Sequence, residues 1–392
     1  MDEHQFDAAL RALHAGTTRR AGLAGALGVL LGGRTGALAG DAARGRADAS
    51  RAQAAPESGG WHYQSQFGRG CGSTTRYCLT GPGGMSISAD GTVAYVFDSR
   101  SADDSAIAAA RVAVYVRNPG STTWYYSHAF GNICGSNPRN SHFCLGADAS
   151  GLSVSADGTR AYVADTSNSR IAVYSRNPGS TTWYYSHAFG NGSLSDLLSI
   201  AVSGDELTAW VADTRKHRIL IWTRPSTSST TWSFSTQFGW PGSSNDNFSY
   251  PAGIAVSADT LTTWVADSNN SRIAIWTRPS TSSKTWSYRD SFGTRGEGDS
   301  NFRSPKGIAV SADTLTVWVA DTGNNRIAVW DRPDKDSTDW SPSAQFSGFG
   351  TGASALKHPF NVAVTPDGLT ALVSGNRDWR FSAGVVETWT KS

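Results

Sequence analysis

The stretch Gly253-Ile-Ala-Val-Ser-Ala-Asp259 recurs as Gly307-Ile-Ala-Val-Ser-Ala-Asp313 and, in altered form, as Asn361-Val-Ala-Val-Thr-Pro-Asp367. The copies follow one another at a spacing of about 54 residues. Three more copies lie upstream, at 84–88, 151–155 and 199–203. A period of about 40–55 residues that contains only short strands is typical of propeller blades. The sequence therefore predicts an all-β fold, a six-bladed β-propeller.

Each copy contains four candidate strands. In the fourth copy the first strand is the small-residue stretch that begins at Gly253, and the second ends in Val265-Ala-Asp267. The third strand is Ile273-Ala-Ile-Trp276, and the fourth runs from Trp286 to Gly293. Apolar residues alternate along these stretches with the period of two that a packed sheet requires. Small residues suit the innermost strand because the blades converge at the axis.

The sixth copy ends at its third strand, near the C-terminus. Its missing fourth strand lies at the other end of the repeat region, because Trp61-His-Tyr-Gln-Ser-Gln-Phe-Gly68 matches Trp286-Ser-Tyr-Arg-Asp-Ser-Phe-Gly293. We expect this N-terminal strand to complete the last blade and close the ring, which leaves no open sheet edge. The propeller is predicted to span residues 61–392.

The first 60 residues have a different composition, and all 15 Trp follow them. Arg19-Arg20 precedes a short apolar run rich in Gly and Ala, 21–33, and a small-x-small site at Ala37-Leu38-Ala39. This pattern predicts a signal peptide over 1–39 that resembles a twin-arginine signal, followed by a flexible linker over 40–60. The run is too short to span a bilayer. We expect an exported, extracytoplasmic protein without stable membrane insertion after signal removal.

The charge is nearly balanced, with 34 Lys and Arg against 32 Asp and Glu. No global field would draw such a protein to nucleic acid or to an anionic membrane. Nucleic-acid binding is therefore not favoured, and we expect a monomer.

The repeat resembles the NHL family. The stretches that carry the resemblance are Val319-Ala-Asp-Thr-Gly-Asn-Asn-Arg-Ile327 and the loop and strand from Phe292 to Val310. The resemblance extends over 61–392 and implies the propeller fold. It implies little about function, because similar propellers include enzymes, RNA binders and interaction modules.

An Asp ends the second strand of most copies, and an Arg follows five residues later. One interpretation is a structural role as a turn clamp, in which the carboxylate binds turn N–H groups and pairs with the Arg. The other interpretation is a functional role, in which these residues form a charged rim that binds a polar ligand. The candidate residues are Asp165, Asp213, Asp267 and Asp321.

Thirteen of the 15 Trp fall at repeated strand positions and are predicted to pack within and between blades. Two lie outside the register. Trp240 follows the Phe-Gly pair in a loop between blades, and Trp379 lies in a loop of the last copy. The loops between blades and the loops between second and third strands should open on the same face of the propeller. These two residues are candidate contacts for a glycan or peptide, unless each packs against its own loop.

Four cysteines form two close pairs in equivalent loops. In an oxidising compartment we expect the disulfides Cys71–Cys78 and Cys134–Cys144.

Three histidines fall in loops of the same face: His142, His217 and His358. They could hold zinc, and NHL relatives that amidate peptides bind zinc through propeller histidines. The alternative interpretation is that they are solvated loop residues, because they share no repeat position.

Two functions remain open at this point. The first is a binding scaffold for an extracytoplasmic protein or polysaccharide, which needs no cofactor. The alternative is a metal-dependent lyase or hydrolase with zinc or calcium at the channel mouth. No complete catalytic motif is present in the sequence, so we expect a binding protein rather than an enzyme.

Overall fold

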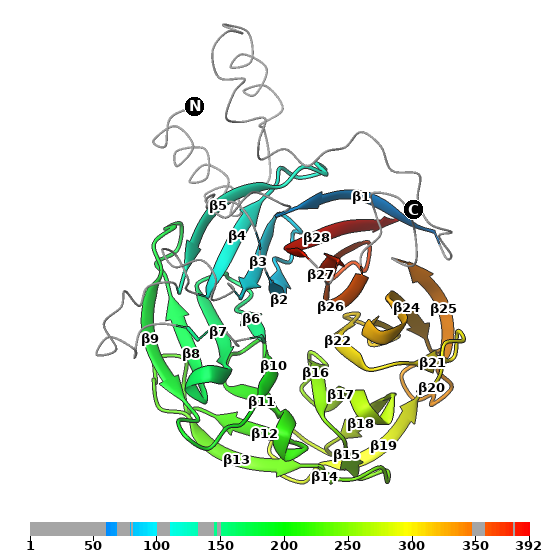
Figure 1. Ribbon diagram of the computed structural model, residues 1–392. Helices are drawn as coiled ribbons and strands as arrows, with labels where there is room; N and C mark the ends of the chain where they lie inside the picture. The colour runs from blue at the N-terminus through cyan, green and yellow to red at the C-terminus, as the bar shows by residue number, and fades with distance from the viewer. Residues whose placement is uncertain are drawn as a thin grey trace, which may run out of the picture.

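Six four-stranded antiparallel sheets are arranged as blades around a central axis (Figure 1). The computed structural model describes residues 60–68, 79, 81–99, 110–131, 145–146, 150–346, 357–378 and 381–392. The predicted all-β, six-bladed propeller is confirmed. The signal peptide and nearly all of the linker lie outside the described residues and stay predictions. No helix in the described part is long and apolar enough to cross a membrane.

The strands of each blade follow one another outward from the axis, and the last blade alone recruits its outer strand from the N-terminal side. Blades 1 to 3 contain β2 (Pro82–Ile87), β3 (Val93–Asp98), β4 (Arg111–Val116) and β5 (Tyr125–Phe130); β6 (Leu152–Val154), β7 (Arg160–Asp165), β8 (Arg170–Ser175) and β9 (Tyr184–Phe189); and β10 (Leu197–Val202), β11 (Thr208–Asp213), β12 (Arg218–Thr223) and β13 (Ser233–Phe238). Blades 4 to 6 contain β16 (Pro251–Val256), β17 (Thr262–Asp267), β18 (Arg272–Thr277) and β19 (Ser287–Phe292); β22 (Pro305–Val310), β23 (Thr316–Asp321), β24 (Arg326–Asp331) and β25 (Ser341–Phe346); and β26 (Lys357–Val364), β27 (Thr370–Asp378), β28 (Phe381–Lys391) and β1 (Trp61–Phe67).

The N-terminal strand closes the ring, as the sequence match predicted. β1 pairs antiparallel with β28, from Trp61 opposite Lys391 to Phe67 opposite Val386. Figure 1 shows β1 in blue lying along the outside of the red β28. The closure satisfies the backbone groups of a strand edge that would otherwise stay unpaired.

The hydrophobic core is divided into six clusters, each between two neighbouring blades. A Trp at or just before the start of every outer strand lies against the Phe that ends the outer strand of the preceding blade. The ring centroids are 4.2–5.2 Å apart. Large aromatic surfaces are thus removed from water at every blade junction. The pairs are Phe67–Trp124, Phe130–Trp183, Phe189–Trp232, Phe238–Trp286, Phe292–Trp340 and Phe346–Trp61.

The innermost strands approach one another too closely for large side chains. A Cβ added to Gly253 of β16 would lie 2.1 Å from the carbonyl oxygen of Lys306 in β22. This close approach explains why five of the six copies carry Gly or Ser at the position of Gly253.

Candidate functional site

The loops between blades and the turns between second and third strands meet on one face of the ring. In blade 5 the turn residue Gly323 donates its N–H to the carbonyl of Arg303, 2.7 Å away in the preceding inter-blade loop. In blade 4 Asn269 makes the equivalent bond to Ser249, at 3.0 Å. We call this surface the loop face. It carries every residue that the sequence singled out for ligand binding and that the structure describes.

The repeated Asp residues are buried under the loop face. Asp321 is 0% exposed, and its carboxylate accepts hydrogen bonds from Arg326 Nε (2.9 Å), Asn324 Nδ2 (2.8 Å) and the backbone N of Arg303 (2.7 Å). The same contacts with the paired Arg and with an entering-loop N–H recur at Asp165, Asp213 and Asp267. The geometry is that of a clamp that joins the turn, the third strand and the inter-blade loop. Ligand binding by these carboxylates stays a prediction, and it would require the clamp to open.

In blades 2 to 5, the turn between the second and third strands contains one residue with a left-handed backbone conformation. In blade 5 a 3₁₀ turn, η7 (Thr322–Asn324), is followed by Asn325 at φ 55°. Left-handed φ values favour Asn and Gly. The turn therefore adopts a positive φ at one position, which Asn325 occupies in blade 5.

Trp240 lies on a small rigid ribbon between blades 3 and 4. β14 (Trp240–Pro241) pairs in parallel with β15 (Asn247–Phe248). Phe248 is completely buried, and Asn247 donates a hydrogen bond to the carbonyl of Pro241 at 2.9 Å. Arg272 of blade 4 donates to the carbonyl of Asn247 at 2.8 Å. The backbone beneath Trp240 is therefore held in place, whereas its side chain is 63% exposed.

A second ribbon shows that the indole is not needed for this local structure. Between blades 4 and 5, β20 (Thr294–Arg295) pairs in parallel with β21 (Asn301–Phe302) in the same register. Thr294 occupies the position of Trp240 and is also exposed. The fold thus builds the same ribbon with a small polar residue where the first ribbon carries a large apolar one.

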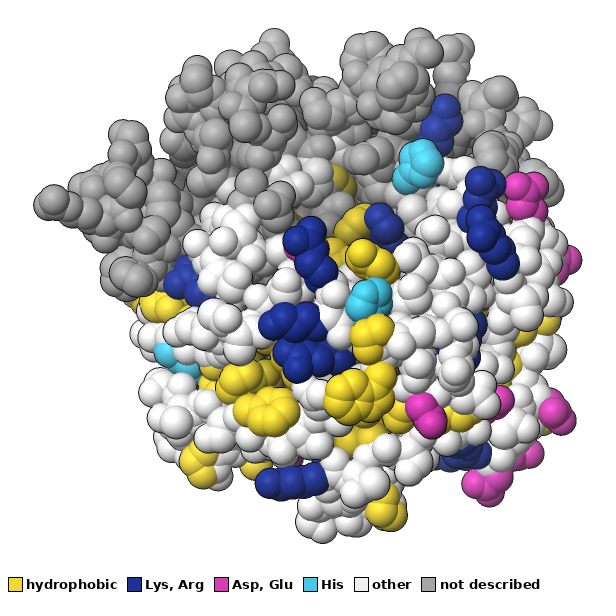
Figure 2. Space-filling view, turned by 60° about the horizontal axis from the view of Figure 1, so that its bottom comes forward, with side chains coloured by type: hydrophobic (Ala, Val, Ile, Leu, Met, Phe, Trp, Pro, Cys, Tyr) yellow, Lys and Arg dark blue, Asp and Glu magenta, His cyan; other side chains and the backbone are white. Residues whose placement is uncertain are grey.

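Tyr250 and His217 add polar and aromatic groups to the loop face beside this ribbon. Tyr250 ends the loop that Trp240 begins, is 44% exposed, and packs edge-on against His217 with centroids 4.8 Å apart. His217 Nδ1 accepts a hydrogen bond from the backbone N of Tyr250 at 3.1 Å. In Figure 2 this side of the ring comes forward, and hydrophobic side chains there adjoin basic side chains and a histidine.

The bond from Tyr250 disfavours metal binding by His217. A neutral imidazole that accepts at Nδ1 carries its proton on Nε2, so Nε2 has no lone pair for a metal. His358 belongs to blade 6, across the ring from the blade 3 residue His217 (Figure 1), and its backbone N donates to Asn325 Oδ1 at 2.8 Å. In the described residues no group of three His, Cys, Asp or Glu side chains could hold a metal ion.

The remaining predicted site residues lie outside the described residues. They are Trp379, His142, Cys71, Cys78, Cys134 and Cys144.

A channel along the axis opens between the six innermost strands. Its cavity has a volume of about 230 Å³, and the lining residues include Gly, Ser, Asn and Lys besides Met, Leu, Ile, Val, Ala and Phe. The surface that faces the cavity is more polar than apolar. Lys306 of β22 is the one ionisable side chain among the described lining residues. Its ammonium lies 4.5 Å from the centroid of the Phe360 ring in β26. Burial lowers the pKa of Lys306 below its usual value.

Sequence reasoning missed Lys306, although a signal was present. Gly83, Leu198, Ala252 and Phe360 take the same place before the small-residue motif in other copies. A lysine in a row of uncharged residues breaks the repeat pattern. A search at each repeat position for the copy that departs from the other copies would have found Lys306.

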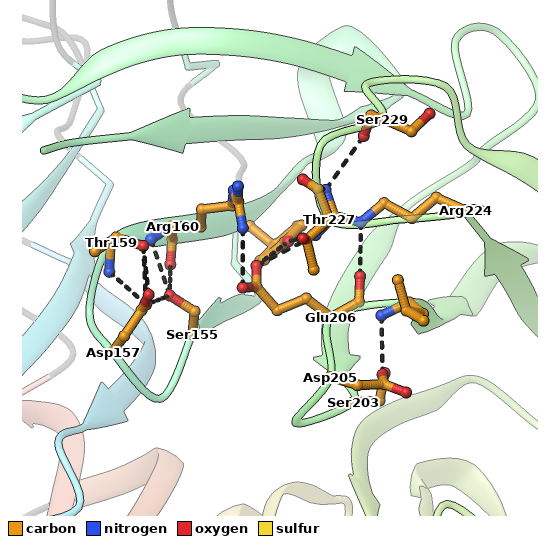
Figure 3. A network of polar contacts seen from close by, with 12 residues as sticks. Ser155, Asp157, Thr159, Arg160, Ser203, Asp205, Glu206, Arg224, Thr227 and Ser229 are labelled. Atoms are coloured by element: carbon orange, nitrogen blue, oxygen red, sulfur yellow. Dashed lines mark hydrogen bonds and ion pairs between the residues drawn. The ribbon is translucent and has the colours of Figure 1, made fainter.

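Figure 3 shows a network of polar contacts at the ends of the strands that lie opposite the loop face. Glu206 accepts a hydrogen bond from Tyr162 at 2.6 Å, and it pairs with Arg160 at 3.0 Å and with Arg224 at 3.4 Å. Burial raises the pKa of the Tyr162 phenol. Because these groups satisfy one another and join blade 2 to blade 3, we interpret the network as structural.

Comparisons with known proteins support the repeat assignment. The NHL repeat model matches residues 248–276 and 302–330, which fall in blades 4 and 5. This match supports an NHL-repeat propeller. None of the curated proteins matches the chain.

Solved structures resemble the chain at the level of the fold. A protein from Lactobacillus plantarum aligns with a TM-score of 0.52 and 14% identity over 75% of this chain and 77% of that one. A protein of unknown function from Desulfotomaculum acetoxidans aligns at 0.50 with 13% identity over 75% and 79%. A protein from Bacteroides uniformis, provisionally assigned as a 6-phosphogluconolactonase, aligns at 0.50 with 14% identity over 76% and 79%. At these identities the likeness shows the propeller fold alone.

Proposed function

We propose that this protein is an exported propeller that binds an extracytoplasmic protein or polysaccharide on its loop face, with Trp240 as the apolar anchor. The observation that supports it is the exposed indole on a rigid ribbon whose sister ribbon carries Thr294 instead. Exposed Trp residues at rigid positions are frequent anchors of interfaces. A backbone that is already ordered before binding also reduces the conformational entropy that is lost when the partner binds.

Tyr250, which ends the loop that Trp240 begins, and the exposed Arg215–Asp196 pair, 2.7 Å apart, would provide polar contacts on the loop face. A partner that presents both an apolar surface and hydrogen-bonding groups fits this combination, as sugars and peptide segments do. The protein would act as a monomer outside the cytoplasm and would need no cofactor. The metal-dependent lyase or hydrolase has no supporting cluster among the described side chains.

The test replaces Trp240 by Thr, the residue that the sister ribbon carries. We expect Trp240→Thr to weaken partner binding by about 2 kcal/mol or more, the loss typical of a hot-spot aromatic. The melting temperature should stay within about 2 °C of wild type, because the fold tolerates Thr at this position. Binding is measured on glycan and cell-wall arrays and, separately, on arrays of envelope proteins.

The matched control is Tyr184→Ala on the outer strand β9, where the side chain is 59% exposed away from the loop face. It removes a comparable aromatic surface and should leave binding unchanged. Equal losses in the two variants would indicate non-specific aromatic adhesion. A wild-type protein that binds no array component would contradict the proposal.

A further inference from the structure

The channel contains a charge without a counter-charge. Lys306 is half-buried, and the described lining residues include no carboxylate. Its ammonium rests on the Phe360 ring at 4.5 Å, a favourable contact that does not neutralise the charge. Desolvation alone lowers the pKa of Lys306, and no neighbouring acid raises it. Charges removed from water are normally paired, so this lysine lacks the partner that burial demands.

The place in the fold does not need a lysine. The equivalent positions of other blades carry Gly83, Leu198, Ala252 and Phe360. The blades with Gly83, Leu198 and Ala252 have the same inner-strand pairing as the blade with Lys306. The pairing of the inner strands therefore does not require a cation at this point of the ring.

A second polar group lies on the neighbouring strand. β22 and β26 approach so closely that a Cβ on Gly307 would lie 2.5 Å from the Cα of Asn361. Asn361, next to Phe360 in the chain, lines the same cavity as Lys306. An ammonium and a primary amide together provide N–H donors for a single anionic group.

We propose that the axial channel binds a small organic monocarboxylate, whose carboxylate meets Lys306 and Asn361 and whose short hydrocarbon part lies along the channel wall. One ammonium compensates one negative charge. A dianionic phosphate would leave a second charge buried, and a neutral ligand would leave the lysine unpaired. The cavity of about 230 Å³ suits a ligand of a few carbon atoms.

The test uses sodium butyrate and isothermal titration calorimetry on the full mature chain. We expect butyrate to bind the wild type, and 1-butanol, butylamine and inorganic phosphate to bind at least about 10-fold more weakly. Lys306→Met keeps the length of the side chain and removes the charge. It should weaken butyrate binding about 10-fold or more and raise the melting temperature slightly, because a half-buried charge without a counter-charge is gone.

Asn361→Asp is the second variant, and it changes shape very little. Its carboxylate would pair with Lys306 and should displace butyrate, even if Lys306→Met fails to fold. Lys284→Met, at an exposed surface site, is the control and should bind butyrate as the wild type does. The proposal is wrong if butyrate does not bind, if butanol or phosphate binds equally well, or if both channel variants retain wild-type affinity. None of these outcomes depends on whether Trp240 binds a partner.

Discussion

At the scale of single residues, burial separates two carboxylates that share one arginine. Asp321 is 0% exposed and binds Arg326 Nε at 2.9 Å, whereas Asp299 is 77% exposed at the side chain and lies 3.7 Å from Arg326 Nη1. A buried pair that loses one partner leaves an uncompensated charge, whereas an exposed pair in water contributes little.

We therefore expect Asp321→Ala to lower the free energy of unfolding by about 3–5 kcal/mol, and Asp299→Ala to change it by less than about 1 kcal/mol. Urea denaturation of the two variants measures the difference. An effect of Asp321→Ala as small as that expected for Asp299→Ala would show that the clamp contributes little to stability.

The residues predicted to bind ligands also differ in how far their side chains are buried. The sequence pattern placed Asp267 and Trp240 equally on the loop face, but Asp267 is 0% and Trp240 63% exposed. A residue's position along the chain does not reveal which neighbouring loop covers it, because that loop comes from the preceding blade.

At the scale of the element, β1 is the strand on which ring closure depends. Trp61 is completely buried, stacks on Phe346 at 4.6 Å and meets Trp318 edge-on at 6.3 Å. These contacts join the N-terminal strand to blade 5 as well as to its own blade.

We expect Trp61→Ala to lower the free energy of unfolding by about 3–5 kcal/mol, since it opens a cavity at the closing junction. Tyr125→Ala on β5, 45% exposed, is the matched control and should have an effect within about 0.5 kcal/mol. Both values come from chemical denaturation followed by tryptophan fluorescence. If Trp61→Ala had the smaller effect, the ring would not depend on this junction.

At the scale of the whole molecule, repeated turn carboxylates couple stability to pH. Hydrogen bonds from Ser311 Oγ and then from the N–H of Leu315 lower the pKa of Asp313, and Thr365 does the same for Asp367. The folded protein binds these protons less tightly than the unfolded chain does. Their stabilising contribution is therefore present above pH 3.8, the ordinary value, and is lost as the pH falls through the lowered pKa.

Urea unfolding at pH 5, 4 and 3 should show falling stability, with a shallower decline in Asp313→Asn, which has no charge to lose. Asp246→Asn, at an exposed loop position, should keep the wild-type profile. A decline of wild-type steepness in Asp313→Asn would show that this turn does not contribute to the pH dependence.

The amino-acid sequence by itself determined the number of blades, the four strands in each and the closure by Trp61–Phe67, because each of these follows from a local pattern that repeats. It also identified Trp240 as the aromatic outside the register. Only the tertiary structure decided which candidates are accessible and which are clamped, and it alone placed Lys306 beside Phe360 and Asn361 in the channel. Burial and the meeting of neighbouring blades depend on contacts between residues about 54 positions apart, and no local pattern records those contacts.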